Sequence, residues 1–111
     1  MTPEEVVQKQ LEAYNQCDLD AFAATYSDDV KIVDGADNVI CEGVEKLREI
    51  YGPLFKNNPH QMALITKRVA GGEWVCDDEE VIGRADKKRR NAVAIYRVQN
   101  GRITFVRLVA K

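Results

Sequence analysis

The second half of the chain constrains the fold most strongly, because two turn signals divide it into strands of fixed register. Gly71-Gly72 and Asn100-Gly101 are dipeptides typical of two-residue β-hairpin turns, and long segments rich in β-branched and aromatic residues flank them. A longer polar loop runs from Gly83 to Lys88. We therefore expect four long antiparallel strands, over residues 60–70, 73–82, 89–98 and 102–109.

The first half of the chain shows helical patterns. Thr2-Pro3-Glu4-Glu5 is a capping box with proline at the first helical position, so it predicts a helix start. Gln10 lies within the apolar stripe of this helix and is expected to point inward. Asp18 is the predicted N-cap of a second, short helix. A third helix should begin near Gly43, and Pro53 should end or kink it.

Composition places the chain among ordinary single-domain proteins. Its 111 residues predict one domain, 1–111, and helices followed by strands predict an α+β fold. A net charge of −2 argues against nucleic acid as the main partner, and no apolar run is long enough for a membrane span. Three cysteines without a CxxC pair, and no visible signal peptide, lead us to expect a cytoplasmic protein without a metal site or cofactor.

Side-chain alternation from the two turns assigns residues to the two faces of the sheet. For the middle hairpin we assume that Ile82 lies opposite Arg89; a slip of one residue would exchange Asp77 and Glu79 for Asp78 and Glu80. One face then combines polar and apolar side chains and is expected to lie under the helices. It includes His60, Met62, Leu64, Thr66, Arg68, Asp77, Glu79, Tyr96, Phe105 and Arg107.

The opposite face is expected to be mostly apolar. It includes Ile65, Val69, Trp74, Cys76, Val93, Ile95, Val106 and Leu108. A second subunit is the simplest cover for such a face, so the pattern predicts a homodimer through the outer sheet face. The alternative is the ordinary scatter of exposed aliphatic residues.

Two acidic residues are candidates for the chemistry of a pocket. Asp34 follows Val30 and Ile32 on one side of a strand, although Asp34-Gly35 is also a common turn dipeptide whose aspartate would cap its own turn. Arg107 could lean across Ala94 toward Asp77 and form an ion pair, either structural or catalytic.

Three stretches of the sequence resemble the SnoaL-like and steroid Δ-isomerase-like proteins of the nuclear-transport-factor-2-like superfamily. These stretches are VVQKQLEAYNQCDLDAFAATYSDDVKIVDG, CEGVEKLREIYGPLF and AIYRVQNGRITFVRL. The resemblance implies a cystatin-like cone, in which a curved antiparallel sheet wraps around three N-terminal helices and encloses a ligand pocket. Dimers of such proteins commonly form through the outer sheet face.

The resemblance also implies a function, proton transfer on a ring- or carbonyl-bearing small molecule. Its general-base aspartate corresponds to Asp34, while the two oxyanion donors of ketosteroid isomerases correspond to Gln10 and Ala94, so both donors are replaced. The alternative is a non-catalytic small-molecule-binding or dimerisation module of the same fold. The predicted ligand-binding residues are Gln10, Tyr14, Arg68, Asp77, Glu79, Tyr96, Phe105 and Arg107.

Overall fold

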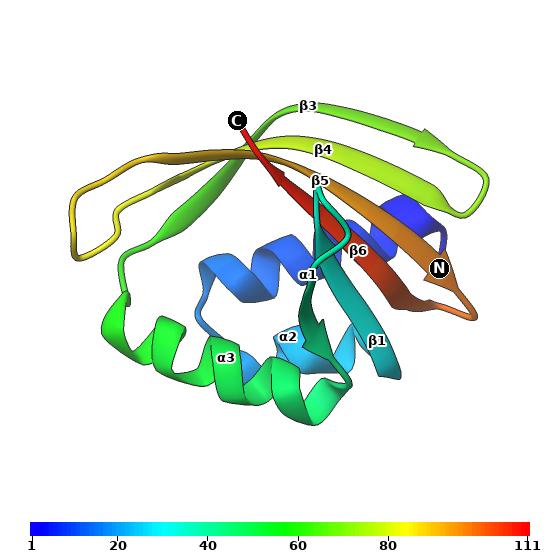
Figure 1. Ribbon diagram of the computed structural model, residues 1–111, viewed down its shortest axis with the longest axis horizontal. Helices are drawn as coiled ribbons and strands as arrows, with labels where there is room; N and C mark the ends of the chain where they lie inside the picture. The colour runs from blue at the N-terminus through cyan, green and yellow to red at the C-terminus, as the bar shows by residue number, and fades with distance from the viewer.

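A computed structural model describes residues 1–111 and shows one curved sheet whose concave face covers three helices (Figure 1). The helices are α1 (Pro3–Asn15), α2 (Leu19–Ala24) and α3 (Val44–Asn57). The strands are β1 (Tyr26–Asp34), β2 (Val39–Glu42), β3 (Met62–Gly71), β4 (Trp74–Ile82), β5 (Arg90–Gln99) and β6 (Arg102–Ala110). The predicted α+β cone is confirmed.

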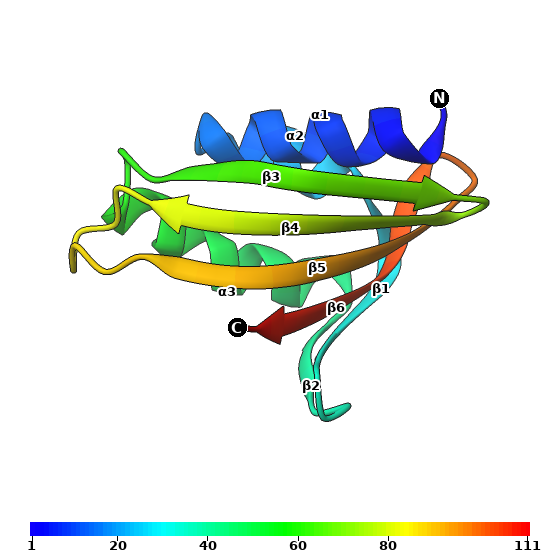
Figure 2. The ribbon, with the colours of Figure 1, turned by 90° about the horizontal axis from the view of Figure 1, so that it is seen from above.

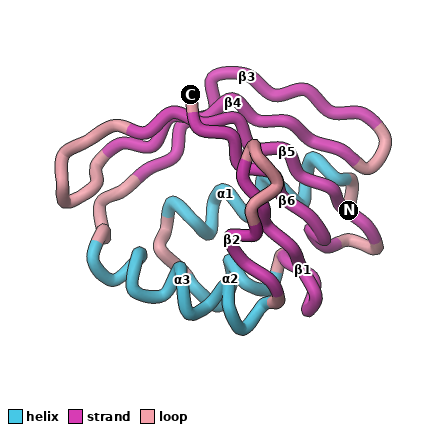
Figure 3. Tube along the Cα trace, in the orientation of Figure 1, coloured by secondary structure: helices cyan, strands magenta, loops and turns pink.

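The sheet order is β2-β1-β6-β5-β4-β3, and all neighbouring pairs are antiparallel except β1 and β6, which run parallel. Figure 2 shows the four long strands side by side with α1 along β3. In the trace of Figure 3 the three helices lie together beneath the sheet. The space between helices and sheet is therefore the interior of the cone.

The predicted helix starts agree with the local chemistry. Thr2 and Glu5 form the reciprocal capping box, and the Asp18 carboxylate accepts a hydrogen bond from the backbone of Ala21. Pro53, by contrast, does not end α3, which continues to Asn57. The expected end at Pro53 is therefore not found, and Phe55, in the turn after the proline, is buried against Phe22 at a ring-centroid distance of 5.3 Å.

The middle hairpin has the expected register, with Asp77 opposite Ala94 and Glu79 opposite Ala92. The hairpin of β3 and β4 differs, because its turn lies one residue further along the chain. Gly72 takes a φ of +57° and Gly71 pairs with Trp74, as in turns that need glycine only at the first central position. The shift preserves facing but brings Arg68 opposite Asp77.

Two β-bulges reverse the expected facing of two half-strands. Thr66 is the extra residue in β3, so Met62 and Leu64 lie exposed on the outer face while Ala63 is buried. Thr104 is the extra residue in β6, where Arg97 pairs with Phe105 and Tyr96 with Val106. Residues beyond each bulge point to the face opposite the predicted one.

The bulges correct both predicted faces of the sheet. Phe105 and Arg107 belong to the outer face, whereas Val106 and Leu108 belong to the inner face. Ile65 lies opposite Glu79 and so shares the inner face. His60 precedes β3, in a turn outside the sheet.

Candidate functional site

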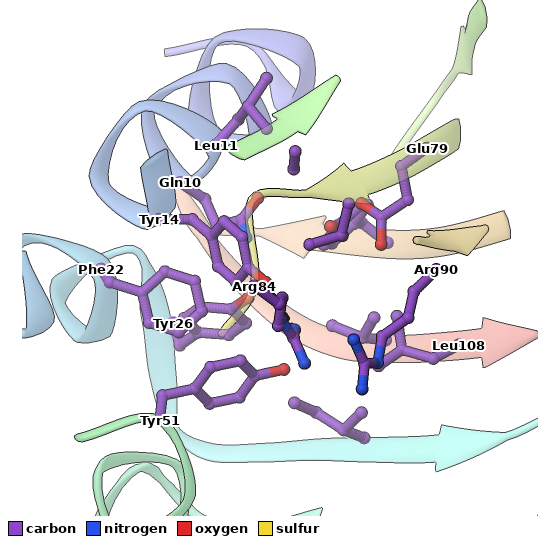
Figure 4. A pocket seen from close by; sticks show the side chains of 15 residues that line it. Gln10, Leu11, Tyr14, Phe22, Tyr26, Tyr51, Glu79, Arg84, Arg90 and Leu108 are labelled. Atoms are coloured by element: carbon purple, nitrogen blue, oxygen red, sulfur yellow. Dashed lines mark hydrogen bonds between the residues drawn. The ribbon is translucent and has the colours of Figure 1, made fainter. Parts of the chain in front are cut away.

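A single apolar cavity of about 160 Å³ lies between the concave face of the sheet and the helices (Figure 4). All three helices and every strand except β2 contribute to its wall. The lining residues are Gln10, Leu11, Tyr14, Phe22, Tyr26, Ile32, Tyr51, Ala63, Glu79, Val81, Arg84, Arg90, Tyr96, Val106 and Leu108. An engineered apolar cavity of about 150 Å³ binds benzene, so this one has room for a single small ring.

Aromatic rings from the three helices form one wall of the cavity. The ring of Phe22 lies 4.8 Å from that of Tyr51 and 6.0 Å from that of Tyr14, centroid to centroid. Tyr14 in turn meets Phe55 edge to face at 5.5 Å. These tilted and edge-to-face contacts are favourable for aromatic pairs, and they hold the rings as a fixed surface for a flat ligand.

Glu79 is the one carboxylate in the cavity wall. It points inward from the middle of β4, opposite the small side chain of Ala92, and is partly buried (Figure 4). Burial raises the pKa of Glu79 to about 7, with the nearby charge of Asp77 adding to the effect and Arg84 opposing it. This carboxyl group can therefore both take and release a proton near neutral pH.

Arg84 reaches into the cavity from the loop between β4 and β5. Its Nε donates to Oε1 of Gln61 at 3.0 Å and its Nη2 donates to the Tyr14 hydroxyl at 3.0 Å. Gly83 permits this approach, because it has a φ of +77° and a Cβ there would lie 2.3 Å from the carbonyl oxygen of His60. The backbone thus sets the path of the loop, and the hydrogen bonds to Gln61 and Tyr14 hold the guanidinium.

Tyr51 presents a hydroxyl group to the same space (Figure 4). Burial raises the pKa of Tyr51, and the charges of Tyr14 and Glu79 raise it further. The hydroxyl therefore keeps its proton at neutral pH. Since no hydrogen bond within the protein engages it, it can donate to a ligand oxygen.

Asp77 and Arg68 form a partly buried ion pair beside the cavity and do not line it. Nε of Arg68 lies 2.6 Å from Oδ1 of Asp77, and Nη2 lies 2.9 Å from Oδ2. Asp77 is 1% exposed. The prediction that Arg107 pairs with Asp77 was wrong, because the bulge at Thr104 turns Arg107 outward. There its Nη1 donates to the backbone oxygen of Asp34 and pairs with the carboxylate of Asp37.

Asp34 lies at the end of β1 opposite Leu108, on the expected side of the strand, but it is not among the residues that line the cavity. Its carboxylate folds back onto the turn and accepts hydrogen bonds from the backbone amides of Ala36 and Asn38 and from the Asn38 side chain. These hydrogen bonds, led by that from the Asn38 side chain, lower the pKa of Asp34. This is the turn-capping geometry that the dipeptide Asp34-Gly35 allows.

The other predicted ligand-binding residues divide into two groups. Gln10, Tyr14, Glu79 and Tyr96 line the cavity, and ligand binding by them stays a prediction. Phe105 lies on the outer face, with its ring 6.3 Å from that of Trp74.

No group of three His, Cys, Asp or Glu side chains is arranged to hold a metal ion. None of the helices is long and apolar enough to cross a membrane.

Sequence reasoning missed Arg84, Arg90 and Tyr51 as cavity residues. The two arginines lie in and beside a polar loop, and nothing in their local sequence separates them from the exposed Lys87 and Lys88. Tyr51 belongs to the apolar stripe of α3, which marks it as a core residue and gives no sign of its free hydroxyl.

Comparison with solved structures identifies the fold to which this chain belongs. A cystatin-fold protein from Novosphingobium aromaticivorans is 24% identical, with 97% of each chain covered and a TM-score of 0.88. A nuclear-transport-factor-2-like protein from Cytophaga hutchinsonii is 17% identical, with 100% of this chain and 91% of the other covered and a TM-score of 0.80. The chain thus has the cystatin-like, nuclear-transport-factor-2-like fold.

A family model for the SnoaL-like domain matches residues 7–106, and the chain belongs to this SnoaL-like family. A protein with a ketosteroid isomerase-like fold from Catenulispora acidiphila, solved in complex with trimethylamine, is 18% identical. The alignment covers 97% of this chain and 85% of the other, with a TM-score of 0.78. A search of the functionally curated proteins found no match.

Proposed function

We propose that this protein is a small acid–base enzyme that moves a proton on a ring- or carbonyl-bearing compound held in its cavity. The observation that carries the proposal is the Glu79 carboxyl group. It lies in the cavity wall that also holds the donors Tyr51 and Arg84, and its pKa is raised to about 7. A general base is most effective when its pKa is near the working pH. Membership of the SnoaL-like family and the ketosteroid isomerase-like fold of a structural neighbour support the proposal.

The reaction needs two groups besides the substrate. Ionised Glu79 would accept a proton from a carbon next to a carbonyl group, and the Tyr51 hydroxyl would donate a hydrogen bond to the oxygen that gains negative charge. Protonated Glu79 would then return the proton to another carbon of the same molecule. A well-placed general base contributes about 10²–10⁴ in rate, and an oxyanion donor about 10²–10³.

Glu79 replaces Asp34 as the proposed base. The turn-capping hydrogen bonds of Asp34 stabilise its ionised form and weaken it as a base, whereas burial without hydrogen bonds strengthens Glu79. Gln10 and Tyr14 remain proposed ligand contacts, because both line the cavity.

A carboxyl-carbon NMR titration of Glu79 in the ligand-free protein tests the proposal. We expect a midpoint near 7. Glu80 is the internal control, because it lies next in the chain, points to the outer face and pairs with Arg89 at 2.7 Å. A Glu79 midpoint near its ordinary value of 4.5 would remove the base and favour the non-catalytic binding module instead.

Turnover is tested by following exchange of carbon-bound protons of small cyclic ketones in deuterated water. Glu79→Gln keeps the shape of the side chain but cannot accept a proton, so we expect exchange to fall by at least about 10². Glu80→Gln should leave it unchanged. Equal exchange by the two variants would exclude Glu79 as the base.

A further inference from the structure

Arg84 forms no ion pair with any carboxylate of the protein, although its charge acts on Glu79 from a longer distance. Its two bonded nitrogens face neutral groups, the Gln61 amide and the Tyr14 hydroxyl, and no acidic side chain lies within ion-pair distance of it. Arg90, the other arginine of the cavity wall, differs because the Asp86 carboxylate holds it through both Nη atoms. A partly buried charge is costly unless it is paired, so Arg84 is the group that would gain most from an anionic ligand.

The guanidinium of Arg84 is already positioned for such a ligand. Gln61 and Tyr14 occupy Nε and Nη2, while Nη1 donates to no protein group. The supporting loop is held by the close packing of Gly83 on His60 and by the hydrogen bond from the backbone of Ala85 to the Asn58 side chain. Figure 4 shows Arg84 extending into the space between Tyr14, Tyr51 and Arg90.

From these contacts we infer that the cavity takes a small monocyclic carboxylate, with its ring against the aromatic wall and its carboxylate on Arg84. The cavity volume of about 160 Å³ limits the buried part of the ligand to one ring. An arginine partner is suited to a planar carboxylate, because charge-assisted hydrogen bonds to such a group are short and strong. A small monocyclic carboxylate is then the substrate class for the proposed proton transfer. Its binding is argued from Arg84 and the cavity alone, whereas its conversion rests on the proposed function.

Binding of this ligand should depend on the charge of Glu79. An ionised Glu79 would repel the ligand carboxylate, whereas its protonated form would not, so affinity should fall as the pH rises through about 7. Several charged or titratable groups face or adjoin Glu79 from the packed elements. They are Asp77 on β4, Arg84 in the loop, Arg90 and Tyr96 on β5, Tyr14 on α1, Tyr26 on β1 and Tyr51 on α3.

The test compares sodium benzoate with its neutral isostere benzamide by NMR titration of the whole protein at about pH 6, one unit below the pKa of Glu79. We expect benzoate to shift signals of Tyr51 and Leu108 and to bind about 10–100-fold more tightly than benzamide. Equal or tighter binding of benzamide would overturn the inference, as would the absence of cavity shifts with benzoate. The comparison uses the wild-type chain and so does not depend on any variant folding.

A matched pair of variants assigns the effect to Arg84. Arg84→Met should reduce benzoate affinity about 10–100-fold and reduce benzamide affinity much less, because the neutral amide loses no ion pair. Arg89→Met is the control, since Arg89 lies in the same loop region but pairs with Glu80 on the outer face. If the two variants bind benzoate alike, the inference is wrong. The ligand-free titration of Glu79 tests the proposed base separately, so failure of either idea can be recognised without the other.

Discussion

The inward and outward faces of β4 both carry carboxylates, but the inward ones are buried or partly buried beside the cavity and the outward ones lie beside solvent. Four consecutive acids, Asp77 to Glu80, alternate between the faces. Outside, Asp78 pairs with Lys111 and Glu80 with Arg89, both beside solvent. Inside, Asp77 is clamped by Arg68, whereas Glu79 has no ion-pair partner and faces the cavity. Facing decides whether a carboxylate is buried, and a partner decides whether it stays a structural group.

The largest effect should come from breaking the inward pair. Asp77→Asn leaves the Arg68 guanidinium partly buried without its carboxylate, so we expect a loss of about 3–5 kcal/mol in the free energy of unfolding, measured by urea denaturation. Asp78→Asn, its outward neighbour, should cost less than about 1 kcal/mol. If both substitutions cost the same, the contrast between the two faces does not hold.

Glu79→Gln should change stability in a pH-dependent way. The folded pKa of about 7 lies above the ordinary value of 4.5, so the contribution of neutral Glu79 is complete below 4.5 and is lost as the pH rises through 7. Between these limits wild type should lose about 2 kcal/mol relative to the variant, after allowance for partial exposure. Chemical denaturation at about pH 4 and pH 8 measures this difference, and Glu80→Gln should follow the wild type.

Arg84→Met should change the pKa of the Glu79 carboxyl group, although the substitution leaves every acidic residue in place. Arg84 opposes the rise in the Glu79 pKa, so its removal should move the midpoint above about 7 in the carboxyl-carbon titration. Arg89→Met should leave that midpoint in place. A lower midpoint in Arg84→Met would contradict the assigned direction of this interaction.

A substitution on the outer face of the sheet should change the stability of the monomer least. It tests the proposed homodimer instead. Trp74 is 43% exposed and Val69 is 59% exposed on this face. We propose that a second copy covers it, and sedimentation of wild type should then show a dimer that Trp74→Glu converts to a monomer. A monomeric wild type would leave the face as an ordinary scatter of exposed apolar residues.

Part of the fold and of the site could be predicted because local signals and register agree. The capping residues Thr2 and Asp18 started the helices as expected, and the register of the middle hairpin placed Glu79 inward. Gln10 is buried as its place in the helical stripe predicts. These are consequences of short-range hydrogen bonding and of the two-residue period of a strand.

The errors in facing on β3 and β6 have one physical origin, which is that a bulge carries no distinctive residue in this chain. Thr66 and Thr104 are ordinary strand residues, yet each adds one residue to its strand and reverses the facing of everything beyond it. That reversal moved Phe105 and Arg107 outward. The new partner of Asp77 has a separate cause, because the turn at Gly72 brings Arg68 opposite Asp77.

By itself, the sequence determined the helices, the hairpins and the acidic run on β4, because these depend on neighbours in the chain. Only the tertiary structure decided that Arg84 enters the cavity and that the Tyr51 hydroxyl is left free. Both depend on contacts between segments far apart in the chain, such as Gly83 on His60 and Arg84 on Tyr14. The raised pKa of Glu79 is likewise a property of the assembled cavity, since burial is its largest cause.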